Sequence, residues 1–171
     1  MTARVTIQTQ DFSLSDEISA LRRDDGRIGA VCSFVGTVRD VNADASVSGM
    51  TLEHYPGMTE KALAAIIADA KSRWAIVDAL VVHRVGALAP TDQIVLVAVT
   101  SAHRGDAFAA CEFIIDFLKT RAPFWKKEDT SDGARWVEAR ASDDDAAARW
   151  RAPTGPVAAD KPADPVAAGK P

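Results

Sequence analysis

The sequence predicts an α+β domain with a mixed, mostly antiparallel sheet. Three amphipathic helical segments are interspersed with strand-like runs that are rich in β-branched residues. These runs are joined by short turns, they do not follow a regular βαβ order, and no glycine-rich phosphate loop accompanies them. We therefore expect helices that pack on hairpin-type strands, and not a doubly wound parallel sheet.

The chain is predicted to begin with a short helix that is followed by a strand. Apolar residues from Leu14 to Leu21 are spaced for one helical face, and Ser13 followed by Asp16 is typical of a helix N-cap. The run 27–38 is rich in β-branched and aromatic residues, which predicts a buried strand.

A loop, a second strand and a long helix come next. Residues 39–49 are predicted to form the loop, and 50–55 the strand that returns from it. After Pro56 and Gly57, apolar positions from 63 to 74 recur at helical spacing with charged residues between them. This pattern predicts an amphipathic helix.

The second half of the chain is predicted to add three strands and a helix. The runs 77–88 and 93–102 are strand-like and are joined by the turn-forming residues 90–92. Because the run 93–102 is apolar on both faces, we expect it at the centre of the sheet. A helix is predicted over about 105–121, and the run 134–139 closes the set as a strand.

A proline-aromatic sequence follows the third helix. Pro123 ends this helix because a proline disfavours helical backbone at the residue before it. We expect the chain to turn over 122–125, with the rings of Phe124 and Trp125 buried so that Lys126 is held in a fixed place. The alternative is that these are ordinary core aromatics beside solvated lysines.

The length and composition predict one folded domain and a tail. The chain has 171 residues, about the size of a single domain. All the elements above lie within 1–151, whereas 152–171 contains five of the eight prolines and no apolar side chain larger than valine. Such a segment cannot bury enough surface to offset its ordering entropy, so we expect a flexible tail.

Charge and composition exclude several classes of protein. No apolar run approaches the ~20 residues that span a bilayer, so no membrane association is predicted. The 24 acidic and 20 basic residues give a net charge of -4, which argues against a general nucleic-acid binder, so any cationic site must be local. The three histidines lie singly, without zinc-ligand spacing. Cys32 and Cys111 lie in apolar patterns and no apolar signal core begins the chain, so we expect inert thiols in a reducing cytoplasm.

Two candidate anion-binding residues lie where the central strand leads into the third helix. His103 and Arg104 can point at one place together with the free backbone N–H groups of the helix N-terminus. These donors and the helix dipole both favour a negatively charged ligand. The alternative is that His103 only caps the helix and Arg104 is a solvated charge.

Three further cations are candidate site residues. Lys119 lies at the border of the buried helical face, where a partly desolvated amine can serve as a base or nucleophile. Arg39 follows the first strand, and Lys126 follows the proline-aromatic sequence. The alternatives are a snorkelling Lys119 at a helix C-terminus and a solvated loop Arg39.

Five ordered motifs resemble one known family. They are FVGTVRD, LEHYPGMTEKAL, VTSAHRGDAF, LKTRAPFWKKE and RWVEA, and the match to which they belong runs over roughly residues 3 to 150. In this order and at these separations they resemble the large, catalytic subunit of molybdopterin synthase. The resemblance implies a sulfurtransferase of molybdenum cofactor biosynthesis with an α/β-hammerhead fold and a small antiparallel subdomain.

The resemblance also implies partners, a substrate and residue roles. It implies a homodimer in which each protomer binds one small ubiquitin-like sulfur carrier, which makes a heterotetramer. Sulfur from the thiocarboxylated C-terminus of the carrier converts cyclic pyranopterin monophosphate to molybdopterin, without a metal or other cofactor. The catalytic lysines of the family match Lys119 and Lys126, and its anion-pocket residues match Arg39, His103 and Arg104. His103 and Arg104 are expected to serve the site of the neighbouring protomer.

A non-enzymatic function remains as the alternative. A small dimeric module with the same cationic pocket would bind a phosphorylated metabolite for regulation, or would bind the carrier as a scaffold. It would bind the carrier but would produce neither desulfurated carrier nor dithiolene when the pterin is added.

Overall fold

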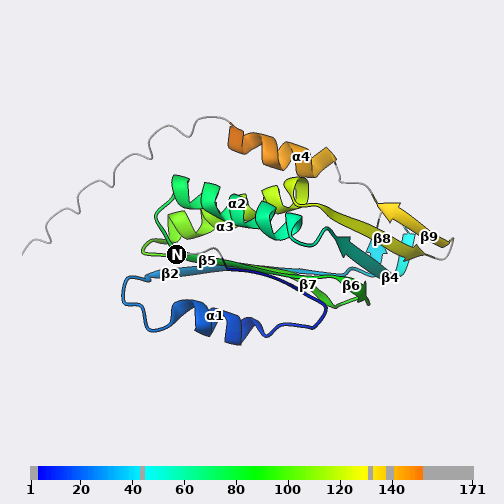
Figure 1. The fold of residues 1–171 in the computed structure, drawn as a ribbon, viewed down its shortest axis with the longest axis horizontal. Coiled ribbons are helices and arrows are strands. Elements are labelled where there is room, and N and C mark those ends of the chain that lie inside the picture. The colour runs from blue at the N-terminus through cyan, green and yellow to red at the C-terminus, as the bar shows by residue number, and fades with distance from the viewer. Residues whose placement is uncertain (1–3, 43–44, 131–132, 138–140, 152–171) are drawn as a thin grey trace, which may run out of the picture.

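The structure, a computed structural model, describes residues 4–42, 45–130, 133–137 and 141–151 (Figure 1). Within these ranges helices flank one sheet on both faces, and a second, antiparallel sheet extends from one end. The α+β class with a mixed, mostly antiparallel sheet is therefore confirmed. The tail predicted over 152–171 lies outside the described residues, as do the last two positions of the strand predicted over 134–139.

The first sheet contains four strands in the order β1-β5-β7-β2. Its pairs are antiparallel except for β1 with β5, which is parallel. The strands are β1 (Arg4–Gln8), β2 (Ala30–Thr37), β5 (Ile76–Arg84) and β7 (Gln93–Ser101). The central position predicted for the run 93–102 is confirmed, because β7 lies between β5 and β2.

The strand predicted within the run 27–38 is confirmed as β2, but its predicted burial is wrong. β2 is an edge strand of the first sheet, and Val31 and Phe34 are 39% and 38% exposed. Its apolar composition is typical of a strand that is buried on both faces. An edge strand is paired on one side only and stays more exposed.

The second sheet is wholly antiparallel. Its strands are β3 (Val41–Asn42), β4 (Ala45–His54), β6 (Gly86–Leu88), β8 (Phe124–Thr130) and β9 (Gly133–Val137). The loop predicted over 39–49 is wrong in part, since β3 and the first half of β4 pair within it. The run 77–88 also forms two strands instead of one, because Gly86, at φ 87, lets the chain leave β5 and pair with β4.

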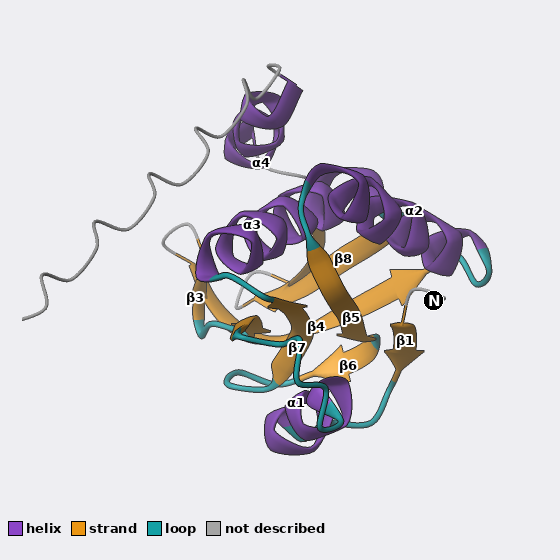
Figure 2. Cartoon of the chain, turned by 90° about the vertical axis from the view of Figure 1, so that its left-hand side faces the viewer, coloured by secondary structure: helices purple, strands orange, loops and turns teal. Residues whose placement is uncertain are grey.

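Helices cover both faces of the first sheet (Figures 1 and 2). α1 (Leu14–Arg22) packs on one face, and its predicted cap is confirmed, since the Ser13 hydroxyl accepts from the Asp16 amide at 3.3 Å. α2 (Met58–Arg73) and α3 (Arg104–Arg121) cover the other face and enclose the main core with β5 and β7. None of the described helices is long and apolar enough to cross a lipid bilayer.

The C-terminal part of the described chain adds elements that the sequence did not predict. α4 (Ala141–Ala148) and the 3-10 turn η1 (Arg149–Arg151) pack against α3. The Trp150 ring meets Trp74 and Phe113 edge-on, with ring centroids 5.6 and 5.5 Å away. α4 carries only alanines as its apolar residues, so its sequence gives no amphipathic signal.

Candidate functional site

α3 carries predicted site residues at its two opposite ends. His103 is the N-cap residue, Arg104 is the first helical residue, and Lys119 lies in the last turn. A helix of 18 residues is about 27 Å long. His103 and Arg104 therefore cannot meet Lys119 around one small molecule within a single chain.

Lys119 and Lys126 flank one short turn. α3 ends at Arg121 and β8 begins at Phe124, so only residues 122–123 connect the two elements. The helix end predicted at Pro123 is confirmed, because Ala122 has extended backbone with φ -81 and ψ 131. Three residues of helix span roughly 5 Å and three of strand roughly 10 Å, so each lysine lies within about 10 Å of the same turn along the chain.

Arg39 lies at the same end of the molecule as these lysines. Its neighbour Val38 is buried in a cluster with Leu52, and Leu52 lies directly opposite Lys126 in the pairing of β4 with β8. Val38 is fixed by two backbone hydrogen bonds of 2.9 Å, in which its amide donates to the Asp92 carbonyl and its carbonyl accepts from the Thr91 amide. The Arg39 side chain itself is exposed.

The topology explains why α3 brings Lys119 to the end where Arg39 lies. β2 pairs antiparallel with β7, so the end of β2 that precedes Arg39 lies opposite Gln93, at the start of β7. α3 begins just after the other end of β7 and packs back along β7 and β2. Its C-terminal turn, which carries Lys119, consequently returns toward Arg39, whereas His103 and Arg104 stay at the far end.

Lys126 is held by a buried carboxylate. Its Nζ lies 2.6 Å from Oε1 of Glu128, which is 1% exposed, while the Lys126 side chain is 32% exposed. The two side chains point to the same face of β8 because they are two residues apart in a strand. A buried carboxylate is costly unless it is paired, so the ion pair with Glu128 favours a fixed position of the Lys126 side chain.

Lys119 has a looser environment than Lys126. Its side chain is 51% exposed, and its Nζ lies 3.6 Å from Oδ1 of Asp143 on α4. An exposed pair at this distance contributes little free energy. The Lys119 ammonium can therefore turn toward a ligand at small cost.

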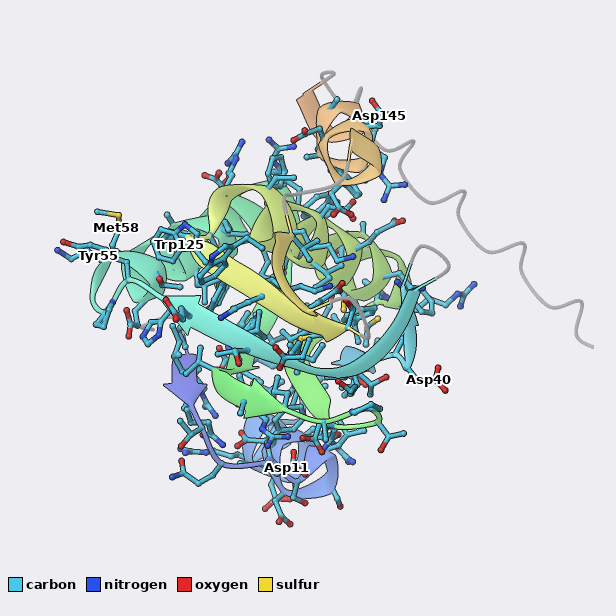
Figure 3. All side chains as sticks on the ribbon, turned by 90° about the vertical axis from the view of Figure 1, so that its right-hand side faces the viewer. Asp11, Asp40, Tyr55, Met58, Trp125 and Asp145 are labelled. Carbon is cyan, nitrogen blue, oxygen red and sulfur yellow. The ribbon has the colours of Figure 1, made fainter. Side chains whose placement is uncertain are left out.

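The prediction that both Phe124 and Trp125 are buried in the turn is half wrong. The Phe124 ring packs against the core and stacks on His83, with ring centroids 3.9 Å apart and planes 17° apart. Both aromatics belong to β8, so alternation places Trp125 on the opposite face, where it is 48% exposed. Figure 3 shows Trp125 near Tyr55 and Met58 at one corner of the molecule.

Three residues of this region were missed by sequence reasoning: Thr59, His83 and Glu128. Each is almost fully buried in the fold, although each belongs to a residue type that is usually exposed or only partly buried. Burial lowers the pKa of His83 to about 4, so the ring is neutral and its Nδ1 donates to the Arg84 carbonyl at 2.8 Å. Strand alternation gave no signal for these residues, because β5 is buried on both faces and β8 was not predicted as a strand.

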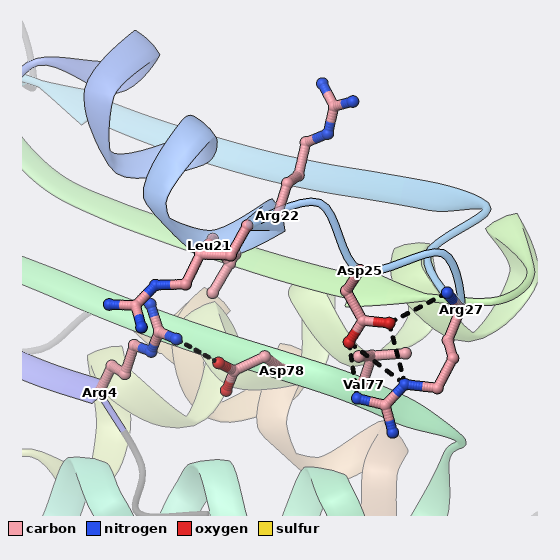
Figure 4. Close-up of a pocket in the computed structure, with 8 residues that line it drawn as sticks. Arg4, Leu21, Arg22, Asp25, Arg27, Val77 and Asp78 are labelled. Atoms are coloured by element: carbon pink, nitrogen blue, oxygen red, sulfur yellow. Dashed lines mark hydrogen bonds and ion pairs between the residues drawn. The ribbon is translucent and has the colours of Figure 1, made fainter.

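A hollow of about 400 Å³ lies elsewhere, at the end of α1 beside β1 and β5 (Figure 4). None of the five predicted site residues lines it. Much of its charge is compensated locally, because Arg4 pairs with Asp78 at 3.0 Å and Arg27 pairs with Asp25 at 2.6 Å.

The cysteines and acidic groups of the described residues do not form a metal site. No group of three or more His, Cys, Asp or Glu side chains within the described ranges is placed to hold a metal ion. Cys111 is buried and Cys32 half-buried, and burial raises the pKa of the Cys111 thiol, so this thiol stays protonated and unreactive.

Comparison with known proteins places the chain in a family. The model of the MoaE protein family matches residues 7–121. The molybdopterin synthase catalytic subunit of Ralstonia nicotianae is 64% identical over 146 residues, which are 85% of this chain and 83% of the relative. The subunit of the same name from Escherichia coli is 54% identical over 147 residues, or 86% of this chain and 97% of the relative.

Solved structures agree with this placement. The molybdopterin biosynthesis MoaE protein of Burkholderia ambifaria has a TM-score of 0.75 at 60% identity, over 86% of this chain and 97% of that chain. A protein complex of subunits 1 and 2 of molybdopterin-converting factor from Helicobacter pylori shares the fold, with a TM-score of 0.66 at 20% identity over 80% of this chain and 91% of that chain. The chain belongs to the MoaE family, the catalytic subunits of molybdopterin synthase.

Proposed function

We propose that this chain converts cyclic pyranopterin monophosphate to molybdopterin, with sulfur taken from the thiocarboxylated C-terminus of a small ubiquitin-like carrier. The observation that carries the proposal is the placement of Lys119 and Lys126 on either side of one fixed turn, at the end where Arg39 lies. Substrate and carrier terminus are both anionic. A chain of net charge -4 must gather its cations locally to bind them.

The two lysines are suited to the charges that sulfur transfer creates. The thiocarboxylate sulfur forms a bond to a side-chain carbon of the pterin, the carbon–oxygen bond at that carbon breaks, and the displaced oxygen leaves with a proton. Water then cleaves the resulting thioester, which returns the carrier as a carboxylate and leaves the sulfur on the pterin as a thiolate. Negative charge develops on the acyl oxygen while water attacks, and a nearby ammonium stabilises it. One of Lys119 and Lys126 assists sulfur attack and proton transfer, and the other stabilises this charge.

Arg39, His103 and Arg104 are proposed to hold the phosphate of the substrate. Since α3 separates His103 and Arg104 from Lys119 by most of its length, these two residues act in the site of a second protomer. The active assembly is then a homodimer that binds two carriers. The Helicobacter pylori complex of two subunits supports a small-subunit partner of this kind.

One assay tests the proposal. The purified chain is mixed with thiocarboxylated carrier and the pterin monophosphate, and the dithiolene product and the desulfurated carrier are measured. We expect both to form with the wild-type chain and neither with Lys119→Ala, whose carrier affinity stays near normal. Near-normal turnover by Lys119→Ala would overturn the residue assignment. Carrier binding without either product would instead identify a scaffold that only holds the carrier.

A further inference from the structure

The turn between the two lysines has few backbone hydrogen bonds of its own. The Ala122 amide donates to the Leu118 carbonyl at 3.3 Å, and the Phe124 amide donates to the Ala122 carbonyl at 2.9 Å. Pro123 has no N–H group to donate. Its carbonyl needs a partner from another part of the fold if the turn is to hold one shape.

Thr59 supplies that partner. It lies in the first turn of α2 and is fully buried, and its Oγ1 is 3.2 Å from the Pro123 carbonyl oxygen. The same Oγ1 lies 3.0 Å from the Tyr55 carbonyl and accepts the Tyr55 amide at 3.1 Å. Thr59 thus bridges two segments that are 64 residues apart in the sequence.

The hydroxyl proton of Thr59 is best placed on Pro123. A hydroxyl has one proton to donate, and a carbonyl has two lone pairs. The Tyr55 carbonyl already accepts the Met58 amide at 3.2 Å and the Thr59 amide at 3.0 Å. Thr59 is the only hydrogen-bond donor to the Pro123 carbonyl among the described residues, so the hydroxyl donates there.

Thr59 is itself rigidly placed. The preceding Gly57 caps α2 with φ 80, and its amide donates to the Glu60 carboxylate at 2.6 Å. On the other side of the turn, Phe124 lies opposite His54 in the pairing of β4 with β8 and stacks on His83. The turn is therefore held between α2 and the two sheets.

We propose that Thr59 is a positioning residue that sets the geometry between Lys119 and Lys126 by holding the Pro123 carbonyl. This inference rests on the function proposed above. Lys119 precedes the turn by three residues and Lys126 follows it by three, so a rotation of the turn moves both ammonium groups relative to each other. Displacements of about 1 Å at a reacting centre lower rates by as much as about a hundredfold.

Thr59→Val and Thr59→Ser separate the hydroxyl from the shape of the side chain. Valine keeps the branched shape and removes the hydrogen bonds, whereas serine keeps the hydroxyl. With thiocarboxylated carrier and pterin monophosphate at saturation, we expect Thr59→Val to lower kcat by about tenfold or more. We expect its carrier affinity to stay within about twofold of the wild type, and Thr59→Ser to recover most of kcat.

Thr100→Val is the matched control for general destabilisation. Thr100 is equally buried, and its Oγ1 also bridges a backbone amide and carbonyl, those of Asp78, at 2.9 and 3.1 Å. It lies in β7 near the far end of the sheet from the turn. We expect Thr100→Val to lower the melting temperature as Thr59→Val does and to leave kcat unchanged.

The outcomes distinguish this inference from the proposed function. A folded Thr59→Val variant with wild-type kcat, or an equal loss in Thr100→Val, overturns the role of Thr59. Retained turnover in Lys119→Ala and Lys126→Ala overturns the assignment of the lysines instead. If Thr59→Val does not fold, the same comparison is made between Thr59→Ala and Thr59→Ser, measured well below the melting temperature of each.

Discussion

Lys126 and Glu128 form an ion pair of 2.6 Å on one face of β8, although Glu128 is 1% exposed. The two partners differ in their exposure to solvent, because the Lys126 side chain is 32% exposed and can be partly hydrated. A carboxylate that loses a partner at such a depth has little water to replace it. The pair therefore ties the position of a candidate catalytic lysine to the stability of the fold.

Lys126→Met should destabilise the protein more than Glu128→Gln does. The first change removes a charged partner from a buried carboxylate and is expected to cost more than the second, which leaves a partly hydrated ammonium and costs about 1–3 kcal/mol. Urea unfolding at pH 8 measures both. Lys127→Met is the control on the opposite face, where Lys127 Nζ lies 6.0 Å from the Trp136 ring, and we expect a loss below about 1 kcal/mol. The reverse order of the first two variants would contradict this account.

His83 makes the stability depend on pH. Its pKa is about 4 in the fold, against 6.5 ordinarily, because burial disfavours the charged ring, with a smaller contribution from His54. Between these values the unfolded chain binds a proton that the folded chain does not, so stability is lost as pH falls from about 6.5 to about 4. The expected contribution is on the order of 3 kcal/mol.

His83→Phe isolates this contribution. Phenylalanine keeps a ring to stack on Phe124 and removes the titrating group. We expect the free energy of unfolding of the wild type to fall more steeply than that of the variant between pH 7 and pH 4, as measured by urea unfolding at several pH values. Parallel profiles for the two proteins would show that the pKa of His83 does not differ between the folded and unfolded states.

Asp116 should anchor the C-terminal elements on α3. One oxygen of its carboxylate accepts from Arg149 Nη2 at 2.7 Å and from Trp150 Nε1 at 2.8 Å. Asp116→Ala leaves the indole N–H without this acceptor and should cost about 1–3 kcal/mol in thermal or urea unfolding. Glu112 is the matched control, because it is exposed and, among the residues that the structure describes, accepts only from Arg149, at 2.7 Å. Equal losses in Asp116→Ala and Glu112→Ala would show that Trp150 is held by its ring packing alone.

The periodicity of apolar residues in the sequence predicted those helices and strands whose own side chains form the core. α2, α3 and β7 carry strong apolar patterns, and the structure has them close to the predicted limits. β8 was missed because its sequence, FWKKEDT, is mostly charged. It is a strand because β4 and β9 pair with it on both sides, and such context overrides local propensity.

The same distinction applies to the candidate site. The turn at Pro123 and the places of Lys119 and Lys126 beside it could be predicted because they are local in the sequence. The hydrogen bond from Thr59 to the Pro123 carbonyl could not be predicted, since it joins α2 to a turn 64 residues away. The sequence also did not predict which of the cations lie together at each end of the molecule. This arrangement depends on how α3 packs back along β7.

Active sites shared between protomers should be restored by mixing two inactive variants. In the proposed homodimer, Lys119→Ala and Arg104→Ala each inactivate both sites. In a mixed dimer, one site carries both substitutions, and the other combines the intact Lys119 of one protomer with the intact Arg104 of its partner. After random subunit exchange, half of the dimers are mixed, so about a quarter of wild-type sulfur transfer should return. If Lys119 and Arg104 acted within one chain, every site would retain a defect and mixing would restore nothing. Mixing Lys119→Ala with Lys126→Ala is the control, because both lysines lie on the same side of a site and no activity should return.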